Sequence, residues 1–229
     1  MVNNATIFSD VLTAWEGWNL SDFAEQRECL LSAQRNMNEL NATLASVMAF
    51  HIQQANVLLA NPHVMPGPTG ETNELYAAGR GVVLVVLESE EAQAKIAAMA
   101  QITTALIAGN GVIVCSGNDK FNQILKSAVE RSGLPTNLVQ FVALEEASTF
   151  IEFDVRVVGL VGSKDTEWQV NHQLANRDGA IGLLVSETDL ALLPVAHDPN
   201  LVLRFITERT RTINITAVGG NATLLELGS

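Results

Sequence analysis

The stretch AGNGVIVCSGNDKF, residues 108–121, decides the fold predicted for this chain. A glycine turn leads into the apolar run GVIVCS (111–116), and a second turn leads into a helical pattern. A turn, a buried strand, a turn and a helix in this order are typical of the nucleotide-binding α/β unit. The turn after the strand carries Ser116, Gly117 and Asn118, with no basic residue and no glycine series to cradle a phosphate. The stretch therefore predicts either a dinucleotide site or only the frame of one.

Apolar runs and helical patterns alternate on both sides of this stretch. The segment 72–87 has the character of one or two strands, of which 82–87 is the more apolar. Further strands are expected at 111–116, 138–144, 155–162 and 180–186, and helices at 90–108, 120–133 and 164–177. Continuous apolar strands between amphipathic helices predict an α/β fold with a parallel sheet and helices on both faces. Gly109 is expected to end the helix before it.

Residues 1–60 are predicted to form a helical extension. Asp22 and Glu25 have the spacing of a capping box, and NMNELN (36–41) could be a break between two helices. An apolar stripe recurs at sevens with intermediate positions filled, at Phe23, Leu30, Ala33, Met37, Leu40, Leu44, Val47 and Leu58. The stripe either packs on its own domain or offers a surface to another domain or subunit.

Three further segments complete the expected organisation. Residues 61–71 hold three prolines and two glycines, which predicts a loop and excludes a helix or a central strand. The α/β domain is expected to span 72–200. In 201–229, strands are expected at 201–209, 211–218 and 222–227, with a GGN turn before the last.

Composition excludes several classes of function. The chain has 229 residues and a net charge of −12, and we find no cluster of lysine or arginine, so nucleic acid and anionic lipid are poor partners. The two cysteines and four histidines show no metal-ligand spacing, which argues against a metal site. No apolar run reaches the ~20 residues that span a bilayer. No secretory signal begins the chain, so a cytoplasmic location is expected.

Four segments together resemble the nucleotide-binding domain of aldehyde dehydrogenases. They follow the order and approximate spacing of that family, at 105–121, 130–142, 155–167 and 176–190. The resemblance implies a Rossmann-type fold over roughly residues 80–190. It also implies which residues stand at the family's cofactor and catalytic positions.

At those positions the chain departs from the family. Cys115, followed by Ser116, stands where the family has the lysine that donates to the adenosine ribose. Gly162 and Ser163 keep the tight turn before a helix whose N-terminus could hold a pyrophosphate. Glu187 stands where the family has its general base, and we interpret it as a solvated carboxylate at a loop end. The family's nucleophilic cysteine would follow Glu187, yet no cysteine follows Cys115. We interpret Cys115 as a small buried residue, and all five positions as vestigial.

A second resemblance covers nearly the whole chain. In proline utilization A, large bacterial enzymes join proline dehydrogenase to pyrroline-5-carboxylate dehydrogenase, and longer members carry a second, degenerate aldehyde-dehydrogenase-like domain. That domain has a Pro-Gly-Pro-Thr-Gly-Glu-x-Asn loop and a Gly-Gly-Asn-Ala-Ser/Thr-Leu tail. The matching residues here are Pro66, Gly67, Pro68, Thr69, Gly70, Glu71 and Asn73, then Gly219, Gly220, Asn221, Ala222, Thr223 and Leu224.

The second resemblance implies a non-catalytic domain of a proline-catabolic enzyme. Such a domain would pack on the catalytic domains and help cover the cavity for pyrroline-5-carboxylate or glutamate semialdehyde. The parent enzyme would use FAD and NAD, with no cofactor in this part, and its association with a membrane is left open. The proline-rich loop is either a rigid turn or a loop clamped against a neighbouring domain. Asn214, Gly219, Gly220 and Asn221 either form a hairpin turn or belong to a tail placed on a partner.

Other functions and assemblies stay open from the sequence. A homo-oligomer is possible. An NAD-binding regulatory module is the alternative function, and a catalytic dehydrogenase is disfavoured by the missing cysteine.

Overall fold

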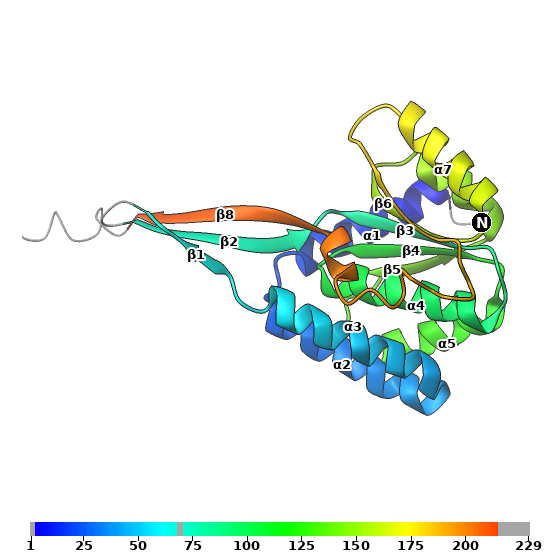
Figure 1. Ribbon diagram of the computed structural model, residues 1–229, viewed down its shortest axis with the longest axis horizontal. Helices are drawn as coiled ribbons and strands as arrows, with labels where there is room; N and C mark the ends of the chain where they lie inside the picture. Colours follow the sequence, from blue (N-terminus) through cyan, green and yellow to red (C-terminus); the bar gives the residue numbers. More distant parts are fainter. Residues whose placement is uncertain (1–2, 68–70, 215–229) are drawn as a thin grey trace, which may run out of the picture.

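A five-stranded parallel sheet forms the centre of the computed structural model, which describes residues 3–67 and 71–214 (Figure 1). Its strand order is β5-β4-β3-β6-β7. The strands are β3 (Val82–Leu87), β4 (Gly111–Ser116), β5 (Val139–Val142), β6 (Val155–Val161) and β7 (Leu183–Glu187). The predicted α/β fold, with its parallel sheet and Rossmann-type alternation, is confirmed.

The central strands are apolar throughout because both faces of the sheet are covered. In β3, Val83, Val85 and Leu87 belong to one hydrophobic core, whereas Val82, Leu84 and Val86 belong to the other. Successive side chains of a strand point to opposite faces, so a strand between two helix layers has no solvent face.

Helices cover both faces of the sheet, in two layers on one face and in one layer on the other (Figure 1). One face carries α4 (Ala92–Ile107) and α5 (Asp119–Glu130), with α2 (Phe23–Leu40) and α3 (Ala42–Leu59) packed outside them. Every residue from Ala97 to Ile107 is buried, because α4 lies between the sheet and this outer layer. The other face carries α1 (Asn4–Trp18), α6 (Ala147–Ile151) and α7 (Lys164–Asn176). Two short 3-10 turns are η1 (Leu144–Glu146) and η2 (Leu201–Arg204).

The predicted helical stripe packs mostly on its own domain. Leu30, Met37 and Leu44 are buried in the core beneath α2 and α3, while Leu40 is 43% exposed. A charge at Leu44 would therefore disrupt this core. The predicted break is confirmed, because Asn41 ends α2 and its side chain caps α3. The stripe lies on the helical pair α2 and α3, whereas α1, which also belongs to the predicted extension 1–60, lies on the opposite face of the sheet.

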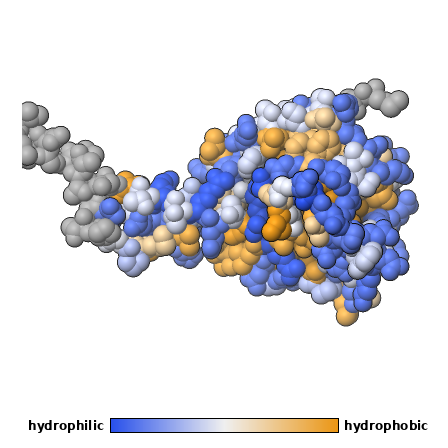
Figure 2. Space-filling model, turned by 90° about the horizontal axis from the view of Figure 1, so that it is seen from above, coloured by the Kyte–Doolittle hydropathy of each residue, from blue (hydrophilic) through white to orange (hydrophobic). Residues whose placement is uncertain are grey.

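A three-stranded antiparallel ribbon stands away from this body (Figures 1 and 2). It has the order β1-β2-β8, formed by β1 (His63–Met65), β2 (Glu71–Gly79) and β8 (Ile206–Asn214). The segment 61–71, expected to be a loop, thus contains an edge strand. The two strands expected at 201–209 and 211–218 are one strand in the described residues: β8 begins at Ile206, after η2, and pairs along all of β2. Residues 215–218 lie outside the described part of the chain. The strand expected at 222–227 lies outside the described residues.

Ion pairing and stacking fasten the ribbon from the solvent side. The Arg211 guanidinium pairs with the Glu74 carboxylate and lies 5.8 Å from the centre of the Tyr76 ring. Both partners belong to β2, so these contacts add to the ladder that holds β8. Exposed pairs of this kind contribute little to stability because water screens them, and the backbone ladder remains the main link.

The amide of Asn110 joins the sheet, the ribbon and the helices. Its Oδ1 accepts from the backbone nitrogens of Arg80 and Gly81 at 2.7 and 3.1 Å. Its Nδ2 donates to the carbonyls of Ala105 and Phe205, both at 2.9 Å. The side chain is fully buried. One amide therefore links the end of α4, the turn between β2 and β3, and the start of β8.

Replacing Asn110 by alanine should destabilise the protein strongly. The substitution leaves the amides of Arg80 and Gly81 without their acceptor in a buried site, which costs roughly 2–5 kcal/mol in total. Urea unfolding followed by circular dichroism would measure the loss. The matched control is Asn38→Ala, an exposed position in α2 that should change stability little. Equal unfolding midpoints for the two variants would contradict this role of Asn110.

Candidate functional site

The strand order places a topological switch point between β3 and β6. From β3 the chain moves outward to β4 and β5, and then returns to β6 and β7 on the other side. Open α/β sheets bind ligands in the crevice at such a point, outside the carboxyl ends of the strands. The residues there are Glu88, which follows β3, and Gly162 and Ser163, which follow β6 and begin α7. The candidate dinucleotide site is this crevice.

The Glu88 carboxylate bridges the crevice. Its Oε2 accepts from the backbone nitrogen of Ser163 at 3.0 Å, and its Oε1 accepts from the Thr166 hydroxyl at 2.7 Å. A methyl group at Gly162 would collide with the same carboxylate. The N-terminus of α7, the place where a pyrophosphate would bind, therefore already holds an internal anion.

Further negative charge surrounds this helix start. Asp165 and Glu167 both lie in the first turn of α7, beside a single cation, Lys164. With Glu88 they make the local field unfavourable to a second anion. Sequence analysis missed Glu88, because a glutamate after an apolar strand carries no signal until the strand order is known.

Glu187 is buried, so its interpretation as a solvated carboxylate is wrong. The residue is 1% exposed, and its Oε2 accepts from the backbone nitrogens of Val195 and Ala196 at 2.8 and 3.1 Å. A carboxylate that satisfies two buried N–H groups fixes the backbone around it. Glu187 therefore anchors the turn that follows β7.

His51 holds the same turn from the opposite side. This α3 residue is buried, and its Nε2 donates to the carbonyl of Ala196 at 3.0 Å. Burial lowers the pKa of His51 to about 4, against the opposing effect of that hydrogen bond, so the ring is neutral near pH 7. The segment around Ala196 is thus held between α3 and β7.

The structure separates Cys115 and Ser116 from the other predicted positions. Gly162, Ser163 and Glu187 come together at adjacent strand ends, and the Gly162 amide donates to the Glu187 carbonyl at 3.2 Å. Cys115 and Ser116 lie on β4, on the far side of β3. Cys115 is fully buried, and this burial, together with the charge of Glu146, raises the pKa of its thiol to about 12. Such a thiol stays protonated at neutral pH.

The residues of the proline-rich motif lie at one end of the ribbon. Gly67 packs so closely that a methyl group there would approach Asn73 Nδ2 to 2.7 Å. Asn73 Oδ1 in turn accepts from the Thr212 hydroxyl at 2.6 Å, and Glu71 pairs in register with Asn214. Pro66 precedes this close contact. Several motif residues lie outside the described part of the chain: Pro68, Thr69, Gly70, Gly219, Gly220 and Asn221.

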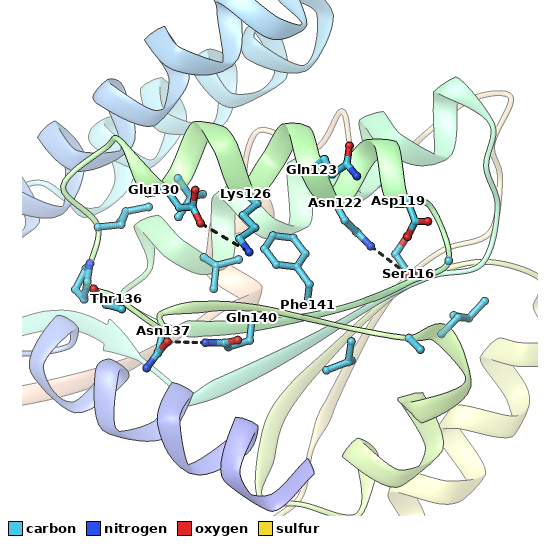
Figure 3. Close-up of a pocket in the computed structure, with 18 of the residues that line it drawn as sticks. Ser116, Asp119, Asn122, Gln123, Lys126, Glu130, Thr136, Asn137, Gln140 and Phe141 are labelled. Atoms are coloured by element: carbon cyan, nitrogen blue, oxygen red, sulfur yellow. Dashed lines mark hydrogen bonds and ion pairs between the residues drawn. The ribbon is translucent and has the colours of Figure 1, made fainter. Parts of the chain in front are cut away.

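A separate groove of about 730 Å³ runs between α5 and β5 (Figure 3). It lies at the edge of the sheet, away from the switch point. Within residues 3–67 and 71–214, no cluster of histidine, cysteine and carboxylate side chains could hold a metal ion. In the same ranges, no helix is both long enough and apolar enough to cross a membrane.

Comparison with known proteins relates this chain to one group of enzymes, although no family model matches it. It is 29% identical over 166 residues to the bifunctional protein PutA of Salmonella typhimurium, and 26% identical over 207 residues to that of Escherichia coli K12. These alignments cover 72% and 90% of this chain. A solved structure of Bradyrhizobium japonicum proline utilization A superposes with a TM-score of 0.71 at 22% identity, over 83% of this chain. The chain is similar to one part of PutA.

The aldehyde-dehydrogenase character of this PutA-like domain is confirmed at the level of fold. An NAD-dependent benzaldehyde dehydrogenase from Corynebacterium glutamicum superposes with a TM-score of 0.56 at 18% identity, over 80% of this chain and 45% of that one. The chain spans only 11% and 14% of the two curated PutA proteins, and 23% of the B. japonicum structure.

The two thiols of the domain should differ sharply in reactivity. Cys29 is partly exposed, whereas Cys115 is buried with its pKa raised to about 12. With a disulfide reagent near pH 8, one thiol per chain should react in the native protein and two in urea. Cys29→Ser serves as the control, since it should abolish the native reaction. Native labelling of Cys115 would contradict the burial of this thiol.

Proposed function

We propose that this PutA-like domain is a non-catalytic part of a bifunctional enzyme that converts proline to glutamate. In this proposal it packs on the catalytic domains and helps cover the cavity through which pyrroline-5-carboxylate or glutamate semialdehyde passes. FAD and NAD would bind in those catalytic domains. The observation that carries the proposal is the Glu88 carboxylate at the N-terminus of α7, where a dinucleotide would need its pyrophosphate.

The state of the cysteines supports the same function. Aldehyde oxidation of the aldehyde-dehydrogenase type needs a thiolate to attack the carbonyl carbon. Cys115, the one cysteine of the parallel sheet, is inaccessible and protonated at neutral pH. Cys29 lies on α2, outside the switch-point crevice, and its pKa is raised as well, by burial and by neighbouring glutamates. Neither thiol is suited to be that nucleophile.

The ribbon is the surface we assign to docking on the catalytic domains. It exposes apolar side chains, with Val64 75% exposed and Ile213 46% exposed. Within the described residues, β8 pairs only with β2, so its other edge is free for a partner's strand. A ribbon that stands away from its own body buries apolar surface only when a partner covers it.

The proposal requires the natural polypeptide to be longer than the 229 residues given. An antibody raised against this chain should detect in source-cell lysate a band several times larger than the chain itself. A band of the chain's own size would overturn the assignment to a bifunctional enzyme.

In that longer enzyme, Ile213→Glu should weaken docking of the ribbon. Intermediate would then escape, so a coupled assay from proline should show a longer lag before NADH forms, with each half-reaction measured separately unchanged. Leu20→Glu, at an apolar position on the body that is 84% exposed, is the control. An unchanged lag in Ile213→Glu would argue against the ribbon as the docking surface.

The alternative function is an NAD-binding regulatory module. The Gly162–Ser163 turn and the helix start after it favour this idea. Calorimetric titration separates the two: no heat with submillimolar NAD supports the scaffold, and measurable binding supports the regulator. In Glu88→Ala the Ser163 amide loses its internal acceptor, so any dinucleotide affinity should rise. Glu90→Ala, an exposed neighbour, should behave as the unsubstituted protein.

A further inference from the structure

The groove between α5 and β5 follows the open edge of the parallel sheet (Figure 3). One wall is formed by one side of α5, including Asp119, Asn122 and Lys126. The other wall is formed by the consecutive residues 139–145. A wall made of consecutive residues of a strand is its backbone edge, because side chains of one face would alternate. The groove therefore follows the β5 backbone.

Unpaired backbone groups of β5 face this groove. Among the described residues, β5 pairs only with β4. The Val112 amide donates to the Leu138 carbonyl at 2.9 Å, and Val112 lies opposite Val139 in the parallel register. In a parallel ladder this directs the polar groups of Gln140 toward β4, and those of Val139 and Phe141 away from it.

The space beside this edge has the form of a strand-addition site. An added strand lies about 4.8 Å from its neighbour, and several peptide-binding domains seat an extended peptide against a sheet edge in this way. Apolar side chains provide contacts for alternate residues of such a strand. Val129 and Leu134 line the groove from the α5 side, and Phe141 lines it from β5 (Figure 3). Backbone pairing would give affinity and these contacts would give selectivity.

The charged side chains that line the groove indicate which kind of strand would bind there. Lys126 is paired with Glu130 at 3.8 Å, which leaves no free cation among the described lining residues. Asp119 and Glu145 also line the groove, and no described cation pairs with either. The net field over the open edge is therefore negative, and it favours basic side chains.

We propose that this groove binds an extended, basic segment of another polypeptide, which adds as a strand to β5. The surface is distinct from the switch point and from the ribbon, so the inference does not rest on the function proposed above. Backbone N–H and C=O groups of Val139 and Phe141 would pair with the segment, while Asp119 and Glu145 would attract its basic side chains.

Hydrogen exchange with a model peptide tests the inference directly. The probe is the blocked hexapeptide Lys-Val-Lys-Val-Lys-Val, and the comparison peptide is Glu-Val-Glu-Val-Glu-Val. We expect the Lys-Val peptide to slow exchange of the Val139 and Phe141 amides at least tenfold. The Gln140 amide, already bonded within the sheet, should change little. Exchange of the Val139 and Phe141 amides that is unaffected by the peptide would overturn the proposal.

Two variants separate the groove from general attraction to an acidic protein. Glu145→Lys, at an exposed lining position, should weaken Lys-Val binding several-fold in a fluorescence anisotropy titration. Glu208→Lys, an exposed position on β8, changes net charge equally and should leave affinity unchanged. Equal weakening in both variants, or equal affinity for both peptides, would show non-specific binding and reject the groove as a site.

Discussion

The buried amide of Asn110 is the interaction on which the arrangement of the whole domain depends. It satisfies two N–H groups and two carbonyls that belong to three different parts of the chain. The two glycines beside it allow the close packing at this junction. Gly109 has φ of +86°, and a methyl group at Gly111 would approach the Val11 side chain to 2.7 Å. The stretch 108–121 therefore joins the sheet, the helices and the ribbon.

At the switch point, a side chain of the protein itself lies at a helix N-terminus, which is the kind of place that binds a phosphate in other α/β folds. The crevice, the Gly162–Ser163 turn and the helix start all remain, and one carboxylate from the neighbouring strand end occupies the position of an anion. An internal carboxylate at this place provides an acceptor for the N–H groups of the helix start. Function follows from the side chains at a site, and the fold alone does not determine it.

Open strand edges are a second feature of the described part of this molecule. In the described residues, the ribbon leaves one edge of β8 open, and the parallel sheet leaves one edge of β5 open beside an acidic groove. Edges of this kind invite pairing with other chains. The two differ in chemistry, because the ribbon exposes scattered apolar side chains and the groove presents carboxylates. They would therefore select different partners.

The sequence by itself determined the local elements and the class of fold. Continuous apolar runs such as 82–87 predict buried parallel strands, and the caps at Asp22 and Asn41 mark helix ends, because these signals act between residues close in the chain. Only the tertiary structure decided that Glu88 would reach Ser163, 75 residues away, and that Glu187 would be buried. It also decided that β8 would pair with β2, since contacts across 139 residues depend on strand order. Local periodicity predicts that a strand forms. Which strand it pairs with, and which of its residues become buried, depends on how the layers pack.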